Sequence, residues 1–179
     1  MKEILFKTNS QKVIEYLIQK PGKEFLSKEI QVATKMSKAG ANFALNDLAK
    51  ANLVNRQQKG KTYLYTINDE NPVVKQLKIL RTIMNLMRLI KKLKQKSSKI
   101  ILYGSSSRGE DTEDSDIDLF IVTNLIEDIE KIVQRNKHYK KVQPIIRKPL
   151  KYIEMEKTDP TFYQEIEKGI VLWEAKDES

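Results

Sequence analysis

The sequence predicts an α+β fold of two domains joined by a long helix. In the first half, apolar residues recur at helical spacing, and two short strand patterns follow the third helical segment. In the second half, short apolar and β-branched runs alternate with polar turns and helical segments. We therefore expect a first domain at residues 1–70, a linker helix at 71–97 and a second domain at 98–179.

Three helices are predicted in the first domain. Ser10 is the expected N-cap of the first helix, which ends at Pro21-Gly22. A second helix follows Ser27, and Ser37 is the expected cap of a third helix that ends at Lys50. The apolar residues at helical spacing are Val13, Ile14, Leu17 and Ile18 in the first helix, Ile30 and Val32 in the second, and Phe43, Leu45 and Leu48 in the third.

Two strands follow these helices, at residues 53–56 and 62–67, around the polar turn 57–61. Three helices and a β-hairpin resemble a winged helix-turn-helix, and the similarity covers about sixty residues. The resemblance implies that the domain binds DNA, with the third helix at the major groove and the hairpin, or wing, at the phosphates. The implied DNA-binding residues are Lys35, Lys38 and Asn42 on the helix side and Arg56, Lys59 and Lys61 on the wing.

The two halves of the chain differ in charge. Residues 1–98 contain 20 Lys and Arg against 7 Asp and Glu, whereas residues 99–179 contain 13 against 17. A basic first half beside an acidic second half indicates a nucleic-acid-binding module fused to a nucleotide-handling module. A lysine excess is also a common solubility device, and winged helices also dock proteins, so both alternatives stay open.

A long helix is predicted from Pro72 to Lys96. Its apolar face is wider than one small neighbour needs, so we expect it to pack against its own domains and, as a hypothesis, against a second copy of the chain. Helix-turn-helix modules usually bind paired half-sites, which also favours a homodimer. The apolar stripes are Leu77, Leu80, Met84 and Met87, and Ile79, Ile83, Leu86, Ile90 and Leu93.

The second domain opens with a pattern that suits phosphate binding. The run Lys99–Tyr103 predicts a buried strand that ends in the turn Gly104-Ser105. If Ser106 or Ser107 caps a short helix after this turn, backbone N–H groups converge on a point where a triphosphate fits.

After ten further residues, Asp116 and Asp118 begin a second strand, which continues as an apolar run to Val122. Side chains alternate across a strand, so both carboxylates lie on one side and repel each other. A divalent cation, Mg²⁺ or Mn²⁺, relieves this repulsion. By itself an Asp-x-Asp pair is more often a solvated turn, and the preceding loop is acidic throughout; the Gly-Ser turn at this spacing favours a nucleotide site.

Gly104-Ser105 and Asp116-x-Asp118, with Arg108-Gly109 between them, resemble the signature of minimal nucleotidyltransferases of the DNA polymerase β superfamily. The similarity covers residues 98–175 and implies a mixed sheet flanked by helices. It implies that Asp116 and Asp118 are catalytic residues and ligands of Mg²⁺ or Mn²⁺, in transfer of a nucleoside monophosphate from a triphosphate, ATP above all, to an acceptor hydroxyl. The implied nucleotide-binding residues are Gly104, Ser105, Ser106 and Arg108, although an arginine in an acidic loop suits a surface ion pair equally well.

Members of this family commonly carry a third carboxylate on the next strand. That strand is expected at residues 141–146, after a helix at 126–136, and the equivalent position holds Gln143. An amide is not a base and is a weaker cation ligand than a carboxylate. Three alternatives follow: the two aspartates suffice with slower turnover, Glu154 substitutes, or the domain binds nucleotide without transferring it.

The chain ends with a predicted helix at 162–168, a stop at Gly169 and a strand at 170–173. A transferase-like part of about eighty residues has no room for its own base-selecting subdomain. Small nucleotidyltransferases of this kind resemble antitoxins that are paired with a helical toxin protein. The sequence thus predicts a Mg²⁺-dependent, antitoxin-like nucleotidyltransferase with a DNA-binding winged helix; the alternative is a non-enzymatic transcriptional regulator or antitoxin with a degenerate nucleotide-binding transferase fold.

Composition favours a cytoplasmic protein, since no apolar run approaches the roughly twenty residues of a membrane span and no secretion signal is visible. The absence of cysteine excludes disulfides, thiolate zinc sites and thiol catalysis within this chain. His138 is the only histidine. It lies in a basic stretch, which is more typical of a surface residue than of a Ser-His-Asp hydrolase.

Overall fold

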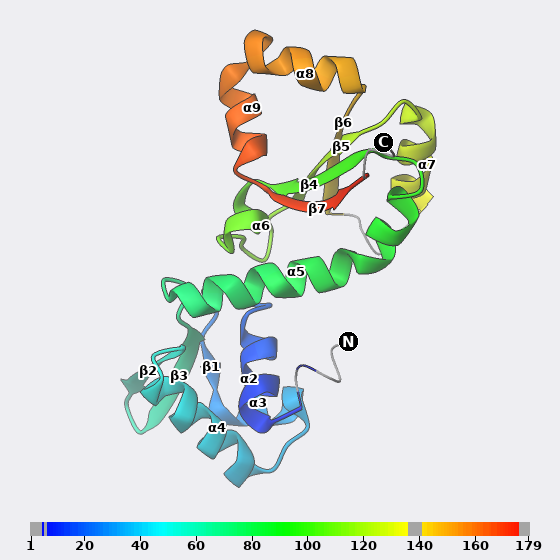
Figure 1. Ribbon diagram of the computed structural model, residues 1–179. Helices are drawn as coiled ribbons and strands as arrows, with labels where there is room; N and C mark the ends of the chain where they lie inside the picture. Colours follow the sequence, from blue (N-terminus) through cyan, green and yellow to red (C-terminus); the bar gives the residue numbers. More distant parts are fainter. Residues whose placement is uncertain (1–4, 6, 136–140, 176–179) are drawn as a thin grey trace. The chain divides into compact units, whose positions relative to one another are not determined.

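The computed structural model describes residues 5, 7–135 and 141–175, so His138 lies outside the described residues. The chain divides into two compact units, Met1–Leu80 and Arg81–Ser179 (Figure 1). Each unit has its own hydrophobic core and is described by itself. None of the helices in the described part of the chain combines the length and the apolar character needed to cross a bilayer.

The first unit is a winged helix-turn-helix. Its sheet has the order β1-β3-β2, with antiparallel pairs throughout, and β2 and β3 form the wing. The turn between the second and third helices contains Lys35, whose φ is 54°. The elements are α2 (Asn9–Leu17), β1 (Phe25–Leu26), α3 (Ser27–Thr34), α4 (Lys38–Lys50), β2 (Val54–Lys59) and β3 (Thr62–Ile67).

Two local predictions for this unit were wrong. The first helix is capped by Thr8 and not by Ser10, because Thr8 and Gln11 form a capping box in which each side chain accepts from the other residue's backbone N–H. The wing strand β2 extends through Lys59, so the turn shrinks from 57–61 to Gly60-Lys61. The prediction missed residues 57–59 because both faces of the hairpin are exposed there. Their sequence therefore lacks the alternation of apolar and polar residues that marks a half-buried strand.

The core of the first unit gathers one face of each helix against the sheet. Phe43 is an exception to the predicted apolar pattern, since it is 72% exposed on α4. The core residues are Val13, Ile14, Leu17, Ile18, Ile30, Ala44, Leu45, Leu48, Val54, Tyr65, Ile67 and Val74.

The long helix α5 (Pro72–Leu93) contributes to both cores: its first turns supply Val74 to the first unit, and its last turns supply Leu86 and Leu93 to the second. It ends three residues before the predicted Lys96. The backbone N–H of Lys96 donates to the Leu93 carbonyl at 2.9 Å, and the Ser97 hydroxyl donates to the same oxygen. These bonds tighten the last turn and close the helix.

The second unit is built on a four-stranded mixed sheet of order β6-β5-β4-β7. Strands β5 and β6 are parallel, whereas β4 is antiparallel to both of its neighbours. The elements after α5 are β4 (Lys99–Tyr103), α6 (Ser105–Arg108), β5 (Ile117–Val122), α7 (Ile126–Arg135), β6 (Val142–Arg147), α8 (Pro149–Thr158), α9 (Pro160–Glu167) and β7 (Ile170–Glu174).

Helices cover both faces of this sheet. On one face, Leu102 and Leu119 pack with the last turns of α5 and with α7. On the other face, Tyr103 and Phe120 pack with α8 and α9. Helix α8 was not predicted, because its apolar residues do not form one buried stripe: Leu150 is 73% exposed. The expected mixed sheet flanked by helices is confirmed (Figure 1).

Replacing Phe120 tests the packing of α8 and α9. Phe120 is fully buried, with ring centroids 5.5 Å from Tyr152 and 6.2 Å from Phe162. We expect Phe120→Ala to lower the free energy of unfolding by about 3–5 kcal/mol, because a large cavity replaces the ring. Urea unfolding followed by the fluorescence of Trp173, the sole tryptophan, measures this unit.

The matched control for this change is Ile153→Ala. Ile153 lies on α8 with 67% of its side chain exposed, and its truncation is expected to shift stability by no more than about 0.5 kcal/mol. Equal unfolding curves for Phe120→Ala and the wild-type chain would contradict the packing described for this face.

Candidate active site

The turn after β4 brings the backbone against a carboxylate of the neighbouring strand. Gly104 has φ +68° and ψ −158°, a conformation that side chains disfavour. A Cβ atom at this position would lie 2.5 Å from Oδ2 of Asp118. The positive φ therefore favours glycine at this position, and a side chain there would also displace the Asp118 carboxylate.

The serines after this glycine do not cap a helix as predicted. The four-residue helix α6 begins at Ser105 and has Gly104 as its N-cap, without a side-chain capping bond. The Ser107 hydroxyl donates to the Gly104 carbonyl at 2.8 Å, and the buried Ser106 hydroxyl donates to the Asp116 carbonyl at 3.3 Å. Ser106 thus ties the turn to the segment that enters β5.

Asp118 is the second residue of the inner strand β5 and pairs with Tyr103 in the β4–β5 ladder. Burial, followed by the nearby negative charge of Asp116, raises the pKa of Asp118. Asp116 lies one residue before β5 and is exposed. The predicted pair is therefore present as two interacting carboxylates, which a divalent cation would stabilise in their charged form.

Gln143 occupies the position next to Asp118 on the adjacent strand, as the β5–β6 register pairs the two residues directly. Paired residues project to the same face of a sheet, so the Gln143 amide lies beside Asp118, on the strand where the sequence resemblance led us to expect a third carboxylate. Within the described residues, no group of three or more acidic or histidine side chains is arranged to hold a metal. Glu154, the predicted substitute, forms an ion pair with Lys151 on α8 at 2.8 Å and does not complete such a group.

Arg108 joins the turn to its own loop and to α9 through two ion pairs. Its Nε lies 2.9 Å from Oε2 of Glu110, and its Nη1 lies 2.7 Å from Oε1 of Glu165 on α9. These bonds raise the pKa of Arg108, with Glu110 as the larger cause. Glu165 was missed in the sequence because it is 57 residues from its partner and no local pattern links them.

Tyr103 borders the same site from β4. Burial, and then the negative charge of Asp118, raises the pKa of Tyr103 to about 12. The phenol therefore stays protonated at neutral pH, and its ring packs edge-on against Phe162 at 5.9 Å. Tyr103 thus lies beside Asp118 in the β4–β5 ladder and belongs to the core that covers this face of the sheet.

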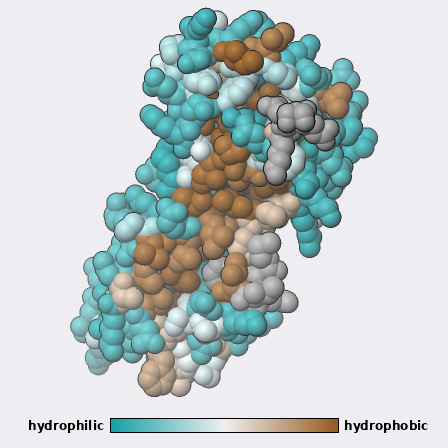
Figure 2. Space-filling view, in the orientation of Figure 1, coloured by the Kyte–Doolittle hydropathy of each residue, from teal (hydrophilic) through white to brown (hydrophobic). Residues whose placement is uncertain are grey.

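The predicted DNA-binding residues all lie exposed on the first unit. Lys35 is in the turn before α4, Lys38 is the first residue of α4, and Asn42 follows one turn later with its amide oxygen 2.6 Å from the Ser27 hydroxyl. On the wing, Arg56 and Lys59 belong to β2 and Lys61 to the hairpin turn. In the view of Figure 2, the wing end of this unit is hydrophilic.

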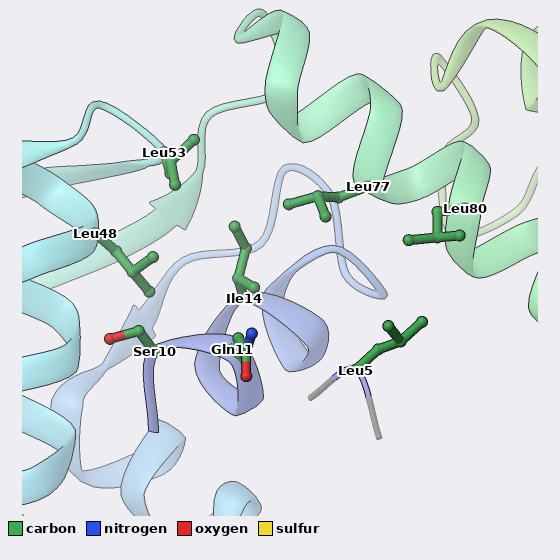
Figure 3. Close-up of a pocket in the computed structure, with 8 residues that line it drawn as sticks. All are labelled: Leu5, Ser10, Gln11, Ile14, Leu48, Leu53, Leu77 and Leu80. Carbon is green, nitrogen blue, oxygen red and sulfur yellow. The ribbon is translucent and has the colours of Figure 1, made fainter. Parts of the chain in front are cut away.

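A small apolar cavity of about 340 Å³ lies elsewhere in the first unit (Figure 3). Helices α2, α4 and α5 supply most of its walls, and the sequence pattern did not point to it. Its lining residues are Leu5, Ser10, Gln11, Ile14, Leu48, Leu53, Leu77 and Leu80.

Several solved structures are weakly similar to this chain. A homodimeric winged helix-turn-helix DNA-binding domain from Mycobacterium bovis has 22% identity, covers 46% of this chain and 72% of its own, and gives a TM-score of 0.38. A protein from Sulfolobus solfataricus described as a candidate nucleotidyltransferase has 16% identity, with coverage of 57% and 89% and a TM-score of 0.39. The archaeal chromatin protein TrmBL2 has 17% identity, with coverage of 88% and 69% and a TM-score of 0.30. At this level of similarity, none of them assigns a function to this chain.

No curated protein matches the sequence. The family described as Polymerase beta, Nucleotidyltransferase matches residues 85–178, which is more than half of the 179 residues. The match contains the Gly104 turn, both aspartates and Gln143. This chain belongs to the polymerase beta nucleotidyltransferase family.

Proposed function

We propose that this protein is a Mg²⁺-dependent nucleotidyltransferase that transfers a nucleoside monophosphate from a nucleoside triphosphate to a hydroxyl group of a protein or nucleic acid, with release of pyrophosphate. We also propose that its winged helix binds DNA. The observation that carries the proposal is the contact between the Gly104 turn and Asp118, with Asp116 close enough to raise the pKa of Asp118. A turn with free backbone N–H groups suits the phosphates of a nucleotide, and two neighbouring carboxylates suit the cation that accompanies them.

The residues at this site fit a hard divalent cation. Asp116 and Asp118 supply carboxylate oxygens and Gln143 an amide oxygen, which are ligand types that Mg²⁺ and Mn²⁺ accept. A bound cation would neutralise phosphate charge and lower the pKa of the attacking hydroxyl. Ser105 and the turn backbone would hold the triphosphate, with ATP as the expected nucleotide, and Arg108 would reach it after exchanging one of its carboxylate partners.

A second candidate function is nucleotide binding without transfer, in a transcriptional regulator or antitoxin. Gln143 beside Asp118 favours it, because an amide cannot accept a proton from the acceptor hydroxyl. A helical toxin protein as the partner, and pairing of two copies of the chain, stay predictions from the family and fold resemblance.

Transfer of label from α-labelled ATP distinguishes the two candidates. With Mg²⁺ or Mn²⁺ and a supply of protein and RNA acceptors, we expect the wild-type chain to form a covalently labelled product. The Asp116→Asn/Asp118→Asn double variant should lose this transfer by at least about 100-fold, because the amides no longer hold the cation. Gel analysis of the labelled acceptor measures it.

The matched control is Asp114→Asn, which removes an exposed carboxylate from the same loop and should leave transfer unchanged. Saturable ATP binding by the wild-type chain without any label transfer would overturn the enzyme and support the regulator.

Duplex binding by the winged helix is tested by its dependence on salt. We expect affinity to fall steeply with salt, because Lys and Arg release counterions from the phosphates they contact. Lys59→Gln/Lys61→Gln should weaken binding to all sequences alike and reduce the slope of log K against log salt by about 2, one for each lost contact. Fluorescence anisotropy at several salt concentrations gives this slope.

Lys131→Gln/Lys151→Gln is the control of equal charge change, because both lysines lie in the second unit, where they pair with Glu127 and Glu154. An equal loss of slope in this control, or binding that does not depend on salt, would argue against the wing as the phosphate contact.

A further inference from the structure

The outer side of α4 presents one large apolar side chain among polar ones. Phe43 is 72% exposed, while Asn42 and Asn46 beside it on the helix are also exposed. Residues three and four apart share a helix face, so Asn42, Phe43 and Asn46 form one surface. The opposite side of α4 is buried through Ala41, Ala44, Leu45 and Leu48.

The wing fixes the orientation of the Asn46 amide. Nη1 of Arg56 donates a hydrogen bond to Oδ1 of Asn46 at 3.1 Å. A guanidinium has donors and no acceptor, so only the amide oxygen can face it. Arg56 is itself held over the ring of Tyr63, 4.6 Å from its centroid. The Asn46 oxygen is thus engaged by the wing, and the amide has its Nδ2 donors to offer to a partner.

We propose that Phe43 and Asn46 together recognise a thymine in the major groove, an inference that rests on the proposed DNA binding. The Phe43 ring would contact the 5-methyl group, and Nδ2 of Asn46 would donate to the O4 atom. Thymine is the only DNA base that offers a methyl group and an acceptor together on its major-groove edge.

The contact of Asn46 with Arg56 argues against the other common partner of asparagine. An asparagine that recognises adenine uses its oxygen and its nitrogen together, on N6 and N7. In this structure the Asn46 oxygen already accepts from Arg56, so the N6 amino group of adenine would have to share that oxygen with a guanidinium. Donors match O4 of thymine and not the N6 amino group of adenine.

The experiment replaces thymine by uracil, which lacks only the methyl group. The wild-type chain of residues 1–179 first selects its binding sequence from a random duplex pool, and each thymine of the selected site is then exchanged for deoxyuridine. At one or more thymines of the selected site, uracil should weaken binding by about fourfold, the effect of one buried methyl group. Phe43→Ala should bind the thymine duplex about as weakly as wild type binds the uracil duplex, with no remaining preference.

Two variants separate this contact from a loss of folding. Phe43→Leu keeps an apolar side chain and should retain part of the methyl preference. Val32→Ala removes the other large apolar side chain exposed on the helix-turn-helix, 67% exposed on α3, and should retain the whole preference. Unchanged thermal unfolding of Phe43→Ala is expected from its exposure.

The outcomes distinguish this inference from the proposed function. Absence of duplex binding by wild type would overturn the DNA-binding function and the inference with it. Binding without a selected sequence, without a uracil effect at any thymine, or with a uracil effect that persists in Phe43→Ala would overturn the recognition of thymine alone.

Discussion

The close approach of Gly104 to Asp118 is the constraint on which the site depends. The antiparallel register pairs Tyr103 with Asp118, so the residue after Tyr103 must turn across the end of β5. This turn has φ +68°, which favours glycine, and a Cβ atom at this position would lie only 2.5 Å from Oδ2 of Asp118. The turn and the carboxylate are thereby held together by the fold itself, a preorganisation that the proposed nucleotide transfer would use.

The two cores of the sheet maintain this register. Leu102 and Leu119 are buried on one face, and Tyr103 and Phe120 on the other, so neither strand can slip by one residue without exposing both sets. A slip would also move Asp118 to the face opposite Tyr103. Burial of the strand centres therefore determines where a polar side chain at the strand end can lie. The pairing of β5 with β6 places Gln143 directly beside Asp118, so the Gln143 amide is part of the candidate site.

Strong local patterns predicted the framework, whereas long-range contacts could not be predicted. The run before Tyr103 and the alternation at Asp116 and Asp118 indicated strands because period and residue type agreed. The pairing of Arg108 with Glu165 leaves no local signal, because the partners meet only after α9 folds onto the sheet. The prediction that Phe43 belongs to the apolar face of its helix was wrong for a different reason. Its spacing suits a helix core, yet the buried face of α4 is made by other residues. Such a mismatch between pattern and burial is itself a functional hint.

The family match and the close approach of Gly104 to Asp118 both centre on the two aspartates. Mn²⁺ binding to the nucleotide-free chain, measured by electron paramagnetic resonance of the free ion, shows whether these carboxylates hold a cation; ATP is left out because it chelates Mn²⁺ itself. We expect the wild-type chain to bind Mn²⁺, Asp118→Asn to lose most of this affinity, and Gln143→Glu to bind more tightly because a third carboxylate joins the pair. Equal Mn²⁺ affinity in all three proteins would show that Asp118 is not a cation ligand.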